Sequence, residues 1–186
     1  SDVYKRQALV TGTVDAGAGI DSLRFTSSMD GLISGIYSAG EFVSFGSGTA
    51  SAQFATAVTA STVIAGGYND SLAFSGAVAD NTIDAGAGAD SLRFNSTFSG
   101  AISGLGATAA EYISFGSNAS VQFSSAVNAS TVLGSGVNDS FLFSGAVGAA
   151  TIDAGAGIDS LVFASAVSGA RISGVFTAAE YISLSL

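Results

Sequence analysis

The sequence predicts an all-β fold, a parallel β-solenoid built from stacked coils of about 17–20 residues. Three observations predict it. The chain is built from a 69-residue repeat, its short apolar segments have a period of two, and Gly, Asn and Asp separate those segments. Apolar residues at a period of two between such links are typical of strands joined by turns.

The repeat is carried by a glycine-aspartate stretch that occurs three times. It reads TVDAGAGIDSLRF from residue 13, TIDAGAGADSLRF from residue 82 and TIDAGAGIDSLVF from residue 151. A related stretch lies shortly before the second and third of these, as TVIAGGYNDSLAFSGAV from residue 62 and TVLGSGVNDSFLFSGAV from residue 131. The chain therefore holds about two and a half copies of a 69-residue unit, which is the pattern of a protein made of stacked repeats.

Within one unit the chain divides into four pieces. In the first unit they begin at Thr13, Leu32, Ser51 and Thr62, and each contains short strands such as the one around Leu23 and Phe25. We therefore expect four coils per unit, with three longer coils as the alternative because the third piece is short for a full coil. No segment has a sustained helical period, and the β-branched and Phe residues favour strands.

The links between strands change length while the strand residues stay aligned. Ile33 and Glu41 are eight residues apart, but the equivalent Ile102 and Glu111 are nine apart, and the next link compensates. Such compensation is expected of a solenoid, in which each coil lies in register on the last. Like residues should then form interior columns, and we expect one column to hold the phenylalanines four positions after each motif aspartate: Phe25, Phe74, Phe94, Phe143 and Phe163.

The composition excludes several classes of function. The formal net charge is −9, with 14 acidic and 5 basic residues, so nucleic acid is not an expected partner. There is no Cys and no His, which removes thiolate and imidazole metal ligands and the usual nucleophile-base pairs. No apolar run approaches the roughly 18 residues of a membrane span.

The two ends of the sequence differ from the rest. The first seven residues, SDVYKRQ, match the translation of a sequencing adaptor, and we expect residues 1–7 to be non-native. Residues 184–186 break the repeat pattern, and we leave open that they are non-native too. Residues 8–183 are then expected to form a single solenoid domain, a fragment of a longer repeat protein.

The glycine-aspartate turns resemble the calcium-binding nonapeptide of the repeats-in-toxin (RTX) family, G-G-x-G-x-D-x-U-x, where U is a large apolar residue. In every copy the match is partial: the first glycine is Ala in three turns, and Tyr68 or Val137 replaces a glycine in the other two. The resemblance implies calcium as a cofactor, held by carboxylates and turn carbonyls. The candidate ligands are Asp15, Asp21, Asp70, Asp84, Asp90, Asp139, Asp153 and Asp159. Sites that bridge adjacent coils are expected only between Asp70 and Asp90 and between Asp139 and Asp159.

Two other interpretations of the acidic residues need no metal. The aspartates can cap tight turns, because Asp accepts backbone N–H bonds in such loops. Three glutamates, Glu41, Glu111 and Glu180, each precede an aromatic-apolar strand, and we expect them at a solvated strand edge.

Taken together, these features favour a structural function. A catalytic site is normally single, whereas every carboxylate pair here recurs with the repeat, so we expect no enzyme. The sequence predicts a rod-forming segment of a large secreted or surface-displayed protein, such as an RTX-like adhesin, a surface-layer protein or a fibre. Its contacts would be with neighbouring repeats of the same chain. The alternative is a module that binds a glycan or a protein on one face, using exposed tyrosines such as Tyr112 and Tyr181.

Overall fold

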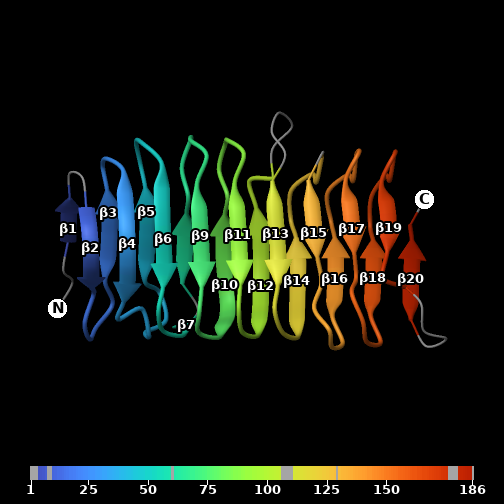
Figure 1. Cartoon of the computed structure of the whole chain (residues 1–186), viewed down its shortest axis with the longest axis horizontal. Coiled ribbons are helices and arrows are strands. Elements are labelled where there is room, and N and C mark those ends of the chain that lie inside the picture. Colours follow the sequence, from blue (N-terminus) through green and yellow to red (C-terminus); the bar gives the residue numbers. More distant parts are fainter. Residues whose placement is uncertain are drawn as a thin grey trace.

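The computed structural model describes residues 4–7, 10–59, 61–105, 111–128, 130–175 and 180–185. These residues form a parallel β-solenoid with two sheets that face each other (Figure 1). The chain runs along one sheet, turns, and returns along the other, so each coil gives one strand to each sheet. The predicted fold class is confirmed. Of the residues expected to be non-native, 1–3 and 186 lie outside the described ranges, and Tyr4–Gln7 form a strand.

The first sheet has eleven strands in the described residues, and the second has nine. The strands of the first sheet are β1 (Tyr4–Gln7), β3 (Ser22–Phe25), β5 (Phe42–Phe45), β7 (Val58–Thr59), β8 (Thr62–Ile64), β10 (Val78–Asp84), β12 (Phe98–Ser103), β14 (Ala119–Phe123), β16 (Ser140–Phe143), β18 (Ser160–Phe163) and β20 (Tyr181–Leu184). Those of the second are β2 (Val10–Asp15), β4 (Met29–Ser34), β6 (Ala50–Phe54), β9 (Ser71–Phe74), β11 (Ser91–Phe94), β13 (Tyr112–Phe115), β15 (Thr131–Leu133), β17 (Thr151–Asp153) and β19 (Arg171–Ser173).

Alternation along each strand fills the space between the sheets. In β9, Leu72 and Phe74 are fully buried, while Ser71 is exposed, as a period of two requires. Parallel pairing in register places Phe74 beside Phe94 on β11, where the rings stack with centroids 4.9 Å apart. The core is therefore a set of ladders that runs through the rod, and stacked rings and aliphatic side chains supply its apolar burial.

The number of coils per repeat differs from the prediction. Between Asp15 and Asp84 the chain makes seven passes across the solenoid, counting the short β7 and β8 as one, and it makes seven more between Asp84 and Asp153. A 69-residue unit is thus three and a half coils, neither four nor three. The error lies in the short piece that begins at Ser51, which was counted as a coil but takes the chain only from β6 on the second sheet to β7 and β8 on the first, which is half a coil.

An odd number of passes sends successive repeats to opposite sheets. The strand that follows the motif turn is β3 on the first sheet, β11 on the second and β18 on the first again. The single phenylalanine column that we expected is therefore wrong. Phe74 and Phe94 stack in the second sheet, while Phe143 stacks on Phe163 in the first, with centroids 4.8 Å apart. Phe25 stacks on Phe45, also in the first sheet.

Close stacking of the turns explains their glycines. Gly86 has φ +83°, and a Cβ atom there would lie 1.9 Å from the carbonyl oxygen of Gly66 in the preceding coil. Only glycine fits such a contact in that backbone conformation. At Gly86, and at Gly155, where a Cβ atom would lie 1.9 Å from the carbonyl oxygen of Ser135, the motif glycine is thus required by the packing of adjacent coils, whatever the turn binds. Within the described residues, no helix has the length and apolarity needed to cross a bilayer.

Candidate functional site

The aspartates at the ends of the motif turns lie inside the solenoid. Five of the predicted metal ligands are between 1% and 3% exposed, and each immediately precedes a strand: Asp21, Asp70, Asp90, Asp139 and Asp159. Burial of so many carboxylates is costly unless each finds hydrogen bonds or loses its charge.

These aspartates form rows with other polar residues at the same place in successive coils. In the second sheet the row runs from Asp70 to Asp90, Glu111 and Ser130, because Ser91 pairs with both Ser71 and Tyr112, and Tyr112 pairs with Thr131. In the first sheet, one row is Asp21, Glu41, Ser61 and Asn81, and another is Asp139, Asp159 and Glu180. We call these three sets the inner acid rows.

In four of these aspartates, Asp70, Asp90, Asp139 and Asp159, one carboxylate oxygen joins two coils. The Oδ1 atom of Asp70 accepts a hydrogen bond from the backbone N–H of Ala50 at 2.6 Å, and that of Asp90 accepts one from the N–H of Asp70 at 2.8 Å. The same arrangement recurs in the first sheet, where Asp159 Oδ1 accepts from the N–H of Asp139 at 2.8 Å. The aspartates thus satisfy backbone donors at the start of the ladder, as the turn-cap interpretation expects.

The hydrogen bonding of the second carboxylate oxygen differs from one aspartate to the next. The Oδ2 atoms of Asp70, Asp90 and Asp159 are buried and have no hydrogen-bond partner among the residues that the structure describes. In contrast, Asp139 Oδ2 accepts from both the N–H and the hydroxyl of Ser135, at 2.7 and 2.9 Å. The rows are therefore only partly satisfied by the protein, which leaves room for a proton or another ligand at the remaining oxygens.

Burial raises the pKa of these acids. It raises the pKa of Asp70 to about 6 and that of Glu41 to about 7, since desolvation disfavours the carboxylate; Asp90 and Asp21, respectively, raise them further by charge repulsion. Desolvation also raises the pKa values of Asp90, Glu111, Asp139 and Asp159. With pKa values of about 6 and about 7, Asp70 and Glu41 take up protons at mildly acidic to neutral pH, and a protonated carboxyl group can donate a hydrogen bond as well as accept one.

The glutamates of the inner acid rows correct a prediction. We expected Glu41 and Glu111 at a solvated strand edge, but they are 1% and 2% exposed. Glu111 Oε2 accepts a hydrogen bond from the hydroxyl of Ser130 at 2.5 Å in the next coil. The sequence shows that each glutamate is equivalent to a motif aspartate, because each precedes its strand by one residue, but it does not show that this position is buried.

The remaining predicted ligands occupy a different part of the turn. Asp15, Asp84 and Asp153 are exposed or half-buried, and each accepts a hydrogen bond from the N–H two residues ahead, at 3.1, 3.0 and 3.2 Å. Such bonds are characteristic of Asp in tight turns. No set of three or more acidic side chains in the described part of the chain gathers closely enough to hold a metal ion. A calcium ion, which takes six to eight oxygens, would need turn carbonyls or water in addition.

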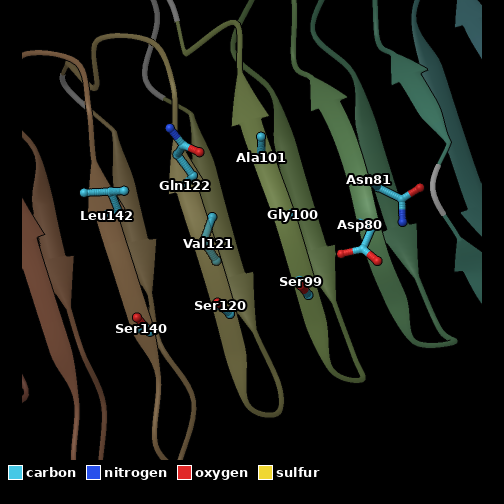
Figure 2. Close-up of a pocket in the computed structure, with 10 residues that line it drawn as sticks. All are labelled: Asp80, Asn81, Ser99, Gly100, Ala101, Ser120, Val121, Gln122, Ser140 and Leu142. Carbon is cyan, nitrogen blue, oxygen red and sulfur yellow. The ribbon is translucent and has the colours of Figure 1, made fainter.

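The outer faces of the sheets carry shallow hollows. One of about 470 Å³ lies on the first sheet beside a bulge in β10, where Ser99, Ser120 and Ser140 follow one another across neighbouring strands (Figure 2). Another of about 390 Å³ lies on the second sheet and is lined by Asp30 and Ser51, among others. The lining residues of the second hollow are Gly12, Thr13, Asp30, Gly31, Leu32, Ser51 and Gln53.

These two hollows are copies of each other. Moving one repeat along the chain takes Gly31 to Gly100 and Gln53 to Gln122. Each glutamine donates to a serine hydroxyl, at 3.0 Å to Ser75 and 3.1 Å to Ser144. Because the repeat has an odd number of passes, the copies lie on opposite faces. These hollows therefore belong to the architecture of the repeat.

Comparison with known proteins returned no matching family model, no matching curated protein and no matching solved structure.

Proposed function

We propose that this chain is a rod-forming structural segment of a larger protein that is secreted or displayed on a cell surface. The observation that carries the proposal is that the interior, the turns and the paired hollows all follow the 69-residue repeat. Residues kept in every repeat serve the stacking of coils, and a stack of such units can be lengthened without limit. The proposal assigns the chain no catalytic role.

The extracellular location rests on sequence features. The resemblance of the turns to RTX repeats supports it, and the acidic composition is compatible with it. An RTX-like adhesin, a surface-layer protein or a fibre would each use such a segment to hold other domains at a distance.

The rod is tested by lengthening it. Inserting a second copy of residues 84–152 before Asp153 adds one repeat, which is three and a half coils. At about 4.8 Å per coil, the insertion should lengthen the particle by roughly 17 Å. Small-angle X-ray scattering measures both the length and the cross-section. An insertion that thickens the particle, or leaves its length unchanged, would refute a linear rod.

Calcium stabilisation is a second proposal. The unpartnered Oδ2 atoms of Asp70 and Asp90 in adjacent coils favour it. A ligand that binds only the folded state raises the unfolding midpoint by mass action. We therefore propose thermal unfolding, followed by circular dichroism, in EDTA and in millimolar calcium. A higher midpoint in calcium supports ligand aspartates, and an unchanged midpoint makes them turn caps in a calcium-independent rod.

A further inference from the structure

Arg93 on β11 is a cation without an acidic partner on an acidic chain. Its side chain is exposed on the outer face of the second sheet. Its Nε donates a hydrogen bond to Asn95 Oδ1 at 2.9 Å, and within the described residues it makes no ion pair. The bond to Asn95 fixes the direction of the guanidinium and leaves its two terminal amino groups available. Such a fork suits a carboxylate, which it can bind with two parallel hydrogen bonds.

An exposed aromatic ring lies diagonally across from this arginine. Arg93 pairs with Ser114 and Ser91 pairs with Tyr112, so Tyr112 is one outward position away on the adjacent strand β13. The ring is 44% exposed. A hollow of about 370 Å³ lies among Arg93, Asn95, Tyr112 and Ser114, at the small end of the range for ligand sites. Gly116 also lines it, and the absence of a side chain there keeps the hollow open.

This combination of residues occurs once in the chain. At the equivalent positions the first repeat has Arg24, Thr26 and Phe42, and the third has Val162, Ala164 and Tyr181. The residues that stack the coils recur in every repeat, but these do not. The set is therefore not required by the fold, unlike the pair of hollows described above.

We propose that this hollow binds an acidic glycan, with a uronic-acid carboxylate on Arg93 and the sugar ring against Tyr112. The C–H face of a sugar ring packs on the electron-rich face of an aromatic ring. The amide of Asn95 and the hydroxyl of Ser114 supply hydrogen-bond partners for sugar hydroxyls. This site does not depend on whether the rod acts as a spacer.

An acidic peptide fits the same surface less well. Extended peptides dock on a sheet by pairing with a free edge, but β11 and β13 are each paired on both sides. The hollow is also open to solvent and has a mixed polar and apolar lining, without a deep apolar pocket for an anchoring side chain. The net charge of −9 opposes any anion at long range, so binding should be weak and should respond to salt.

The test uses an oligomer of galacturonic acid, with the neutral galactose oligomer of the same length for comparison. Calorimetry measures affinity, and NMR follows the Nε–H signal of Arg93. We expect the acidic oligomer to bind with a roughly millimolar dissociation constant and the neutral one to bind more weakly. Arg93→Val should reduce the affinity at least about tenfold, because charge-assisted hydrogen bonds are lost. Val162 shows that the fold accepts valine at this position.

Arg24→Val is the matched control, because it removes the equivalent arginine of the first repeat. It should leave the affinity unchanged, whereas Tyr112→Thr, which copies Thr131 of the next coil, should lower it. The proposal is overturned if the acidic oligomer does not bind, if Arg93→Val leaves its affinity intact, or if Arg24→Val lowers it equally. It is also overturned if a glutamate peptide binds as tightly. Any of these results leaves the scattering test of the rod unaffected.

Discussion

Asp70 and Asp139 hold the same place in successive repeats but differ in what surrounds their second oxygen. Ser135 donates two hydrogen bonds to Asp139, whereas Gly66 stands in the place of Ser135 beside Asp70. The serine hydroxyl is therefore one difference between a satisfied buried carboxylate and an unsatisfied one, in turns that also differ at Ala65 and Gly134 and at Tyr68 and Val137. The pair offers an internal measure of how much these contacts stabilise the rod.

Ser135→Ala should destabilise the protein by about 1–2 kcal/mol, since a hydrogen bond from a hydroxyl to a buried carboxylate is lost. It should also raise the pKa of Asp139 further, because that bond favours the charged form. Urea unfolding measures the first effect, and NMR titration of the carboxyl carbon measures the second. Ser71→Ala, at an exposed position, is the control and should change neither. Equal effects from the two variants would show that the serine-carboxylate contact contributes nothing.

Asp70→Asn should make the protein less sensitive to pH. The pKa of Asp70 is raised in the folded state to about 6 from 3.8, so the folded protein binds the proton more tightly than the unfolded chain. This stabilisation is full below pH 4 and is lost as the pH rises through 6. Glu41, with its pKa raised to about 7, extends the loss to higher pH. The wild-type protein should therefore unfold at a lower midpoint at pH 8 than at pH 5.

Asparagine already occupies an inner acid row at Asn81, whose Oδ1 accepts from the N–H of Ser61 at 2.7 Å. Asp70→Asn keeps that acceptor without the charge. It should stabilise the protein at pH 8 by roughly 1–3 kcal/mol, on the scale of about 1.4 kcal/mol per pKa unit. Midpoints of thermal unfolding from pH 4 to 8 measure the effect, with the exposed Asp30→Asn as control. A wild-type midpoint that rises toward pH 8 would contradict this account.

The sequence could not show that these acids are buried, because a carboxylate at the end of a glycine-rich turn gives the same sequence pattern whether its side chain faces solvent or the core. Periodicity reports which strand residues point inward, and it did so correctly for Leu23 and Phe25. Periodicity does not indicate whether the residue just before the strand is buried. The burial of Glu111 follows from the row that it completes between Asp90 and Ser130, and that row exists only once the coils are paired.

At the level of the strand and the turn, sequence reasoning succeeded for strands and failed in counting coils. Alternation is a local property, so the strands around Leu23 and Val43 were predictable. The count failed at the short piece that begins at Ser51, which takes the chain from β6 on the second sheet to β7 and β8 on the first and is only half a coil. Whether a piece completes a coil depends on which strands it pairs with, and that pairing is a long-range contact.

Glycine at the motif turn can be tested with a matched pair. Gly86→Ala should be strongly destabilising, because the new Cβ would lie 1.9 Å from the carbonyl oxygen of Gly66. Gly17 is the equivalent residue of the first repeat and also has a positive φ, +92°, but no atom of the described residues lies within 4 Å of its Cβ position. Gly17→Ala should therefore cost only the backbone strain, about 1–2 kcal/mol.

The difference between these two variants in urea unfolding isolates the contact between turns. We expect Gly86→Ala to lose at least about 2 kcal/mol more than Gly17→Ala, the range of a core overpacking defect. Equal losses would mean that glycine is needed at this turn for its backbone conformation alone. In that case the motif would carry no information about how adjacent coils pack.

In the whole molecule, the odd number of passes per repeat decides how surface features are distributed between the two faces. A unit of whole coils would repeat every feature on one face, but a unit of three and a half coils alternates features between the two faces. Ser51 and Ser120 are equivalent in sequence and lie on opposite sheets, on β6 and β14. A rod built this way presents the same surface on both sides, so features tied to the repeat give it no preferred face.

Spin labels can test this alternation directly, because the chain has no cysteine of its own. Cysteines at Ser51 and Ser91, two coils apart on one sheet, should give labels roughly 10 Å apart, as should Ser120 and Ser160 on the other. Labels at Ser51 and Ser120 should be much farther apart. They are offset by roughly 17 Å along the rod and also by the roughly 10 Å between sheets, and they point in opposite directions.

Pulsed electron spin resonance measures the longer distance, and line broadening in the continuous-wave spectrum measures the short ones, each on its own doubly labelled variant. If a repeat were four whole coils, Ser51 and Ser120 would lie on one face and their labels would be separated by roughly 19 Å along it. A distance near that value would overturn the alternating arrangement. It would also show that the two hollows lie on the same face and are not related by the alternation. The longer distance would confirm that the repeating surface is the same on both faces of the rod. Arg93 and Tyr112 would then be a feature of one face only.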